Sequence, residues 1–207
     1  MTFAVHRRAE HRKVPWRNGR GTTWEVASAA DPAAGRPGAF LWRLSFAEVT
    51  GVAPFSAFPG IDRTITLVEG GPLRLTVDGA PRELRLHEPF AFPGEARVES
   101  VAEAASIDLN VMVLRDHVEA AVASHVVDPG RGPVVVAGDE EQIVVVLDGA
   151  VTIADGSSAC DAGPRDVVRA ADQPLEVTGS GVVQVVRLSA GRRATRAGAR
   201  STAVLGE

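Results

Sequence analysis

The stretch PFSAFPGIDRTITLVEG, residues 54–70, decides how this chain folds. A turn rich in proline and glycine leads into alternating β-forming residues, and residues 73–79 (LRLTVDG) return as a partner strand. Side chains along a strand alternate between its faces, so Arg63 shares a face with Ile65 and Leu67. Burying a guanidinium at the end of an apolar face is costly unless an anion meets it. We therefore expect Arg63 to meet either a carboxylate of the chain or an anionic ligand.

The same strand resembles in register the first motif of a cupin, in which two histidines precede a glutamate that lies a fixed step before a glycine. Counting back from Gly70, Arg63 occupies the glutamate position, and Ser56 and Phe58 stand near the histidine positions. A cationic side chain has replaced a metal ligand, and the remaining positions offer nothing to a first-row metal. We therefore expect a pocket for an anion, with no metal and no cofactor.

The composition restricts the class of protein. A length of 207 residues allows one large β domain or two small ones, and 45% hydrophobic residues are ample for a packed core. The formal net charge of −4 argues against nucleic acid as a partner. Cys160 is the only cysteine, which excludes an internal disulfide and fits a reducing compartment. Residues 1–13 have no apolar run, and no stretch approaches the ~18 apolar residues of a membrane helix. We expect a cytoplasmic protein without a signal peptide or a membrane partner.

The aromatic residues are confined to the first half of the chain. All seven phenylalanines and three tryptophans lie between Phe3 and Phe92, and there is no tyrosine. Ligand pockets commonly combine aromatic walls with a few polar groups. We therefore expect the pocket in the first half, and a core of aliphatic side chains after residue 93.

Residues 40–49 (FLWRLSFAEV) have the alternation of a half-buried strand. Aromatic and aliphatic side chains, Trp42 among them, occupy one face, and Arg43 and Ser45 occupy the other. Arg43 therefore either lines a pocket or faces solvent.

Residues 106–114 (SIDLNVMVL) are apolar on both faces except for Asp108 and Asn110, which share one face. Two polar residues aimed the same way from a strand that is covered on both sides are unusual. Beyond this strand, Asp116 is a reasonable N-cap, so we expect one or two short helical turns in residues 116–122.

The second half of the chain repeats the first. Residues 145–156 echo residues 66–79, and strands recur every 8–12 residues, which is typical of two β-barrel units. The position that matches Arg63 is Gln142, where nothing suggests chemistry. We expect a first barrel with the pocket in residues 1–120, a second barrel in residues 121–190 and a flexible tail in residues 191–207.

Five blocks of the sequence together resemble one known family, HutD/Ves, and they occur in the family's order. They are residues 16–23 (WRNGRGTT), 42–45 (WRLS), 54–63 (PFSAFPGIDR), 92–95 (FPGE) and 108–112 (DLNVM). The resemblance implies an all-β bicupin, that is, two cupin-like β-barrels packed together with few short helices and without the usual metal ligands. It also implies a non-enzymatic brake on histidine utilisation that senses an intermediate such as urocanate or formylglutamate. One departure is Arg20, where the family usually has a third glycine.

Each candidate site residue has a structural alternative. Arg63 either clamps a ligand carboxylate through a bidentate fork or forms an internal salt bridge, most simply to Asp108. Asp108 and Asn110 either orient a ligand or fix Arg63. Asn18, before Gly19, belongs to a turn or to an anion-binding nest.

Three aromatic residues, Trp42, Phe58 and Phe92, either stack on a planar acid or belong to the core. The five histidines show no metal-binding grouping. We favour a small-carboxylate-binding regulatory protein of histidine utilisation, with a small anionic metabolite as its partner and no catalytic residue, and we leave a homodimer open. The alternative is a metal-free cupin enzyme, an isomerase or lyase of a small organic acid, that uses Asp108 as a base beside Arg63.

Overall fold

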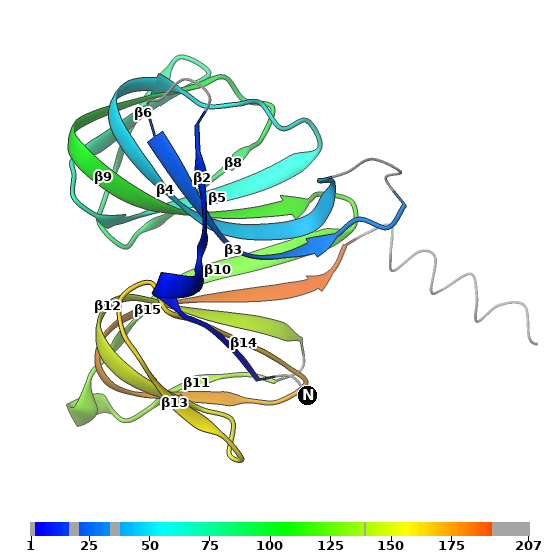
Figure 1. Cartoon of the computed structure of the whole chain (residues 1–207), viewed down its shortest axis with the longest axis vertical. Helices are drawn as coiled ribbons and strands as arrows, with labels where there is room; N and C mark the ends of the chain where they lie inside the picture. The colour runs from blue at the N-terminus through cyan, green and yellow to red at the C-terminus, as the bar shows by residue number, and fades with distance from the viewer. Residues whose placement is uncertain (1–2, 17–20, 34–37, 139, 192–207) are drawn as a thin grey trace, which may run out of the picture.

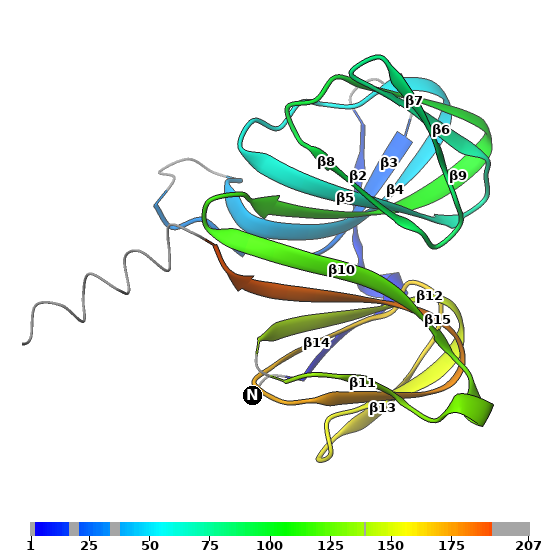
Figure 2. The ribbon, with the colours of Figure 1, turned by 180° about the vertical axis from the view of Figure 1, so that it is seen from behind.

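The computed structural model of the chain describes residues 3–16, 21–33, 38–138 and 140–191. The described residues form two antiparallel β-sheets, one above the other in Figures 1 and 2, and their only helical segments are two short 3-10 turns. The expected all-β fold is thus confirmed. The expected tail, apart from Gly191, lies outside the described residues, and so does Asn18. No helix in the described ranges is long and apolar enough to cross a membrane.

The first sheet has eight strands and contains the stretch that decides the fold. Its main path is β2 (Arg12–Pro15), β3 (Gly21–Ala30), β4 (Phe40–Pro54), β9 (Val98–Leu114), β5 (Ile61–Glu69) and β8 (Pro89–Pro93). The remaining strands are β6 (Leu73–Val77) and β7 (Ala80–Leu84), and β6 pairs with both β7 and β9.

The second sheet has seven strands. Its main path is β1 (Ala4–His6), β14 (Val167–Ala171), β12 (Glu141–Ala154), β15 (Leu175–Ala190) and β10 (Val118–Val127). Two short strands complete it: β11 (Val134–Val136) pairs with β15, and β13 (Ala159–Ala162) pairs with β12. The 3-10 turns are η1 (Arg8–Glu10) and η2 (Pro129–Arg131).

The expectation of helical turns in residues 116–122 is wrong. Strand β10 begins at Val118 and pairs with β15 over its whole length, from Val118 opposite Ala190 to Val127 opposite Gly181. The sequence VEAAVASHVV alternates in burial as a strand does, so pairing with a neighbouring strand overrides the local capping signal of Asp116.

Three apolar clusters show how the sheets pack. One lies inside the curved first sheet and includes Ile65 and Leu75, and one lies inside the curved second sheet and includes Val144 and Ile153. The third joins the sheets, because Leu44 and its neighbours on β4 and β9 pack against residues of β12, β14 and β15. Strand β12 therefore alternates between the core of the second sheet and the shared core. This arrangement is consistent with the expected bicupin.

The pairing of strands divides the chain differently from the expected boundary at residue 120. The N-terminal strand β1 pairs with β14 of the second sheet, and β10 joins that sheet from Val118 onward. The chain thus starts in the second sheet and crosses to the first at β2.

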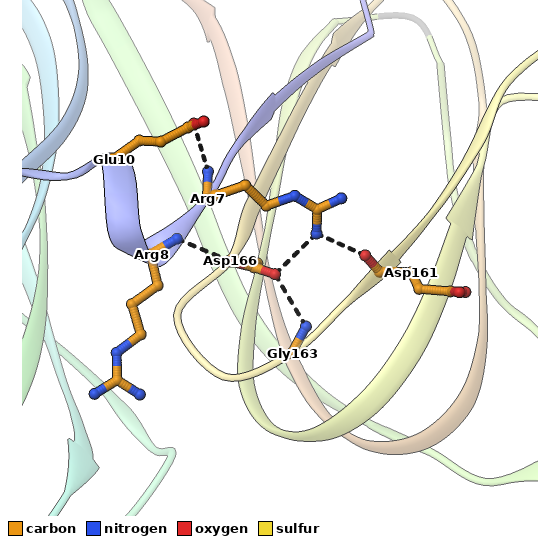
Figure 3. Close-up of polar contacts among 6 residues, drawn as sticks. All are labelled: Arg7, Arg8, Glu10, Asp161, Gly163 and Asp166. Carbon is orange, nitrogen blue, oxygen red and sulfur yellow. Dashed lines mark hydrogen bonds and ion pairs between the residues drawn. The ribbon is translucent and has the colours of Figure 1, made fainter.

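Polar contacts of the segment around η1 hold this crossing in place (Figure 3). The Arg7 guanidinium donates to the Asp161 carbonyl at 2.7 Å and to the Asp166 carboxylate at 3.0 Å. The backbone N–H of Arg8 donates to the other oxygen of Asp166 at 2.9 Å, and Gly163 donates to Asp166 at 3.2 Å. Asp166 thereby anchors the N-terminal segment to the second sheet.

Candidate functional site

The inner face of the first sheet presents a grid of side chains from the three adjacent strands β4, β9 and β5. Arg43, Met112 and Arg63 are paired across the strands and form one row. Two residues further along, Ser45, Asn110 and Ile65 form the next row, and Ala47, Asp108 and Leu67 form the third. The alternation of each strand thus brings both cations, the amide and the carboxyl group to one surface.

A cavity of about 420 Å³ lies over this grid. Its other walls are formed by the loop between β4 and β5, by Thr23 of β3, and by Pro15 and Trp16 at the end of β2. Its lining residues are Pro15, Trp16, Thr23, Arg43, Ser45, Ala47, Pro54, Phe55, Ser56, Phe58, Arg63, Asp108, Asn110 and Met112.

The Arg63 side chain is directed into this cavity and is almost completely buried, with 7% of the residue exposed. Its Nη2 donates to Oδ1 of Asn110 at 2.6 Å, and the amide of Asn110 in turn donates to Oδ1 of Asp108. Arg63 thus forms no direct salt bridge with Asp108, because Asn110 lies between the two charged groups. Nε of Arg63 is buried and has no partner among the described residues.

Asp108 is fully buried, and its Oδ2 is without a hydrogen-bond partner among the described residues. Burial raises the pKa of Asp108 to about 7, although the nearby Arg63 opposes this change. Burial also lowers the pKa of Arg63 to about 10, which leaves the guanidinium protonated at neutral pH. Near pH 7 the site therefore holds a carboxyl group that can gain or lose a proton beside a permanent cation.

Arg43 lines the cavity and does not simply face solvent. Its Nη2 lies 3.1 Å from the sulfur of Met112, and its guanidinium carbon lies 4.8 Å from the ring centre of Phe40 and 5.5 Å from that of Phe58. Nε of Arg43 is buried without a partner among the described residues, and burial lowers its pKa.

The aromatic side chains hold the arginines. The guanidinium carbon of Arg63 lies 5.1 Å from the ring centre of Phe55, 5.6 Å from that of Phe58 and 5.0 Å from that of Phe92. Such contacts stabilise a cation by about 0.5–2 kcal/mol each, depending on its desolvation. Phe58 and Phe92 therefore position Arg63, and of these two only Phe58 lines the cavity.

Trp42 does not line the cavity, so the expectation that it stacks on a ligand there is corrected. It is buried in the core between the sheets, where Arg169 of β14 lies 5.1 Å from its ring centre. The reason is the alternation of β4, which turns Trp42 away from the face that carries Arg43.

Trp16, Phe55 and Met112 line the cavity although they were not among the predicted site residues. Nε1 of Trp16 donates to the hydroxyl of Thr23 at 2.8 Å, which fixes the indole against β3. The signal for Met112 was present in the alternation that singled out Asp108 and Asn110. Asn18 follows Trp16 closely in sequence but lies outside the described residues.

The loop that carries Phe55 and Phe58 is tied to the turn after β8. The N–H of Phe58 donates to the carbonyl of Gly94 at 2.7 Å, and the N–H of Gly94 donates to the carbonyl of Ile61 at 2.7 Å. A Cβ atom at Gly94 would lie 2.6 Å from the carbonyl oxygen of Phe58 and 2.7 Å from that of Ile61. Only glycine fits so close an approach, so Gly94 helps to position the wall of the cavity.

Within the described ranges, no three His, Cys, Asp or Glu side chains are grouped closely enough to hold a metal ion. The cavity instead combines two cations, one titratable carboxyl group and one amide. Guanidinium groups bind carboxylates through paired charge-assisted hydrogen bonds. The arrangement is thus suited to a small anion.

Comparisons with known proteins give a family match over most of the chain. The family model described as HutD matches residues 8–186. The chain is 42% identical over 117 residues to the protein Ves of Citrobacter koseri, which covers 54% of this chain and 59% of that protein. It is also 42% identical over 93 residues to an uncharacterised 21.2 kDa protein in the hutC 3′ region of Pseudomonas putida, covering 44% of this chain and 47% of that protein. The chain thus spans about half the length of the curated relatives that it matches.

Solved structures agree with the fold over nearly the whole chain. HutD of Pseudomonas fluorescens SBW25, solved in a formate condition, superposes with a TM-score of 0.77 at 27% identity and covers 91% of this chain and 98% of that one. A cupin 2 conserved barrel domain protein of Leptotrichia buccalis superposes with a TM-score of 0.57 at 7% identity, covering 86% of this chain and 92% of that one. The second similarity concerns the fold alone.

Proposed function

This chain belongs to the HutD family, and from that premise we propose that it is a regulatory protein of histidine utilisation that binds a small carboxylate without turnover. The observation that carries the proposal is the nearly buried Arg63, whose guanidinium faces a cavity and has no carboxylate of the described residues as an ion-pair partner. The names of the relatives support the pathway, since one relative is encoded in the hutC 3′ region and one similar structure is a HutD.

The electrostatics of Arg63 support an anionic ligand. A buried cation that meets only neutral groups has lost hydration without a full replacement. Asn110 and three aromatic rings provide part of the replacement, but Nε remains without a partner among the described residues. A ligand carboxylate in the cavity, next to the guanidinium, would supply the negative charge that these groups lack. Urocanate and formylglutamate are acids of the implied pathway that have such a group.

Calorimetry of the purified protein with urocanate and formylglutamate tests this proposal. We expect saturable binding of at least one acid, and a loss of affinity by a factor of about 30 to 1000 in Arg63→Met, because a charge-assisted pair is removed. Gln142→Ala is the matched control, because Gln142 occupies the corresponding position of the second sheet. Equal affinities of wild type and Arg63→Met for every acid that binds would contradict the assignment of the site.

One observation favours a second candidate, an isomerase or lyase in which Asp108 transfers a proton. The pKa of Asp108 is raised to about 7 by burial, and its Oδ2 has no partner among the described residues. These are properties of a general base that works near neutral pH. NMR spectra of the same acids, incubated with the protein in D₂O, separate the candidates. Deuterium incorporation or a new product that disappears in Asp108→Asn would establish the enzyme, whereas unchanged acids support binding without turnover.

A further inference from the structure

We propose that the ligand is a short dicarboxylate, with one carboxylate on Arg63 and the other on Arg43. This inference rests on the proposed function, because it takes the cavity over β4, β9 and β5 as the binding site. It goes further by assigning a second anionic subsite at Arg43, which of the two acids named above only the dicarboxylate formylglutamate could fill.

The two arginines are placed to share one ligand. Arg43 on β4 and Arg63 on β5 both pair with Met112, which lies on the strand between them. Neighbouring strands are about 4.8 Å apart, so the two Cα atoms are about 10 Å apart and both side chains start on the same face. Both guanidinium carbons also approach the ring of Phe58, at 5.5 Å for Arg43 and 5.6 Å for Arg63. A short diacid can therefore reach both groups from one position in the cavity.

Neither arginine contacts a negatively charged group among the described residues. Nε of Arg43 and Nε of Arg63 are both buried, and neither has a hydrogen-bond partner among the described residues. The contacts of Arg43 are a thioether and two aromatic rings, and those of Arg63 are one amide and three rings. None of these groups carries a negative charge. A monocarboxylate on Arg63 would leave Arg43 half-buried without an anion, which is unfavourable.

The charge of the cavity supports a dianion. Among the described residues that line it, Asp108 is the only acidic one, and it is connected to Arg63 through Asn110. If Asp108 stayed ionised, it and the two ligand carboxylates would together carry three negative charges against the two positive charges of the arginines. Because the pKa of Asp108 is already raised to about 7, added negative charge nearby shifts it further upward. Binding of a dicarboxylate should therefore be accompanied by proton uptake at Asp108.

Among the described residues, the charged groups near Asp108 are the two arginines of the cavity. Arg63 on β5 acts on it directly, and Arg43 on β4 lines the same cavity. The described lining residues at the end of β2, on β3 and in the loop between β4 and β5 are neutral, as is Asn110 on β9. Proton uptake near neutral pH can therefore be assigned to Asp108 by replacing it with asparagine.

Diacids and their monoamides provide matched probes, because each pair differs only in one carboxylate. We would measure the affinities of malonate, succinate and glutarate against those of malonamate, succinamate and glutaramate. We expect one diacid to bind at least ten times more tightly than its monoamide, since a hydrogen bond to a charged group contributes about 1.5–3 kcal/mol. In Arg43→Met the diacid should fall to the affinity of the monoamide, whereas in Arg63→Met both should bind more weakly.

Arg82→Met is the control variant, because Arg82 also lies over a phenylalanine ring, at 5.2 Å from the ring centre of Phe90, but does not line the cavity. Urea midpoints of all variants show whether each is folded. Titration of wild type in buffers with different ionisation enthalpies should reveal proton uptake with the diacid, and Asp108→Asn should abolish it.

The results separate this inference from the proposed function. Equal affinities for each diacid and its monoamide, or binding of none of the three diacids, would overturn the dicarboxylate proposal even if urocanate binds through Arg63. An unchanged advantage of the diacid in Arg43→Met would also overturn it. Unchanged affinity of every bound acid in Arg63→Met would instead overturn the proposed function itself.

Discussion

Asp108→Asn should make the protein more stable at pH 8 and should leave it nearly unchanged at pH 4. The carboxyl group is fully buried, and its pKa is raised from 3.8 to about 7. The folded state therefore keeps a proton at pH values where the unfolded chain has lost it. The cost of this burial is absent below about pH 4, grows as the pH rises toward 7 and is complete by about pH 8.

The magnitude follows from the size of the change in pKa. Each unit corresponds to about 1.4 kcal/mol, so the wild type loses at most about 4 kcal/mol of unfolding free energy between pH 4 and pH 8 through Asp108. Asparagine has nearly the same shape, and its carbonyl can still accept the hydrogen bond from Asn110. The variant should therefore lack this loss and should exceed the wild type by up to this amount at pH 8.

Urea unfolding, followed by tryptophan fluorescence, measures the effect at several pH values between 4 and 8. The difference between the two proteins removes the contributions of all other groups. Asp155→Asn is the control, because hydrogen bonds from Ser158 and Ser157 lower the pKa of Asp155 below its usual value. This carboxylate is ionised in both the folded and the unfolded state above about pH 5, so the difference between wild type and Asp155→Asn should stay nearly constant from about pH 5 to 8. A constant difference between wild type and Asp108→Asn across the range would refute the assigned pKa of Asp108.

Three further predictions concern the wall of the cavity, the second sheet and the metal content of the protein. Gly94→Ala should lower the unfolding free energy by about 1–3 kcal/mol and weaken ligand binding, because the new Cβ forces apart the carbonyls of Phe58 and Ile61; an unchanged urea midpoint would contradict the role of this close approach. Gln142→Ala should cost about 1–3 kcal/mol of stability, since the fully buried amide donates to the carbonyl of Gln173 at 2.8 Å, but it should leave ligand affinity within a factor of a few. A large loss of affinity there would mean that the site lies in the second sheet. Purified protein should contain no stoichiometric transition metal, and elemental analysis that finds one equivalent, required for ligand binding, would overturn the anion site.

Much of the site could be predicted because it depends on strand alternation. The placement of Arg63 on an inward face and the shared face of Asp108 and Asn110 both follow from a period of two residues. The same rule already separated Trp42 from Arg43, so assigning both to one pocket conflicted with the alternation of their strand. The sequence around Arg63 does not show that Asn110 lies between Arg63 and Asp108. This arrangement depends on the register of β5 against β9.

Other features depend on contacts between distant segments. The rings of Phe55 and Phe58 meet Arg63 because Gly94 ties their loop to another turn, and a single sequence does not show this contact. The pairing of β1 with β14, at the opposite end of the chain, is equally non-local. Val118–Val127 becomes a strand because β15 provides a partner, although a cap residue precedes it. Local patterns predicted the faces of strands, whereas pairing between distant segments determined which faces meet.

The central claim is that Arg63 binds a ligand carboxylate and does not serve mainly to hold the fold. The most direct test combines the urea midpoint and the ligand affinity of Arg63→Met, because methionine retains packing volume without the charge. We predict a loss of affinity of about 30- to 1000-fold for the acid that the wild type binds, with a much smaller change in stability. A structural role for Arg63 would instead lower the unfolding free energy by about 3–5 kcal/mol, because Asp108 and Asn110 would lose their buried cation. Such a collapse of the midpoint, or unchanged affinity for every bound acid, would contradict the account.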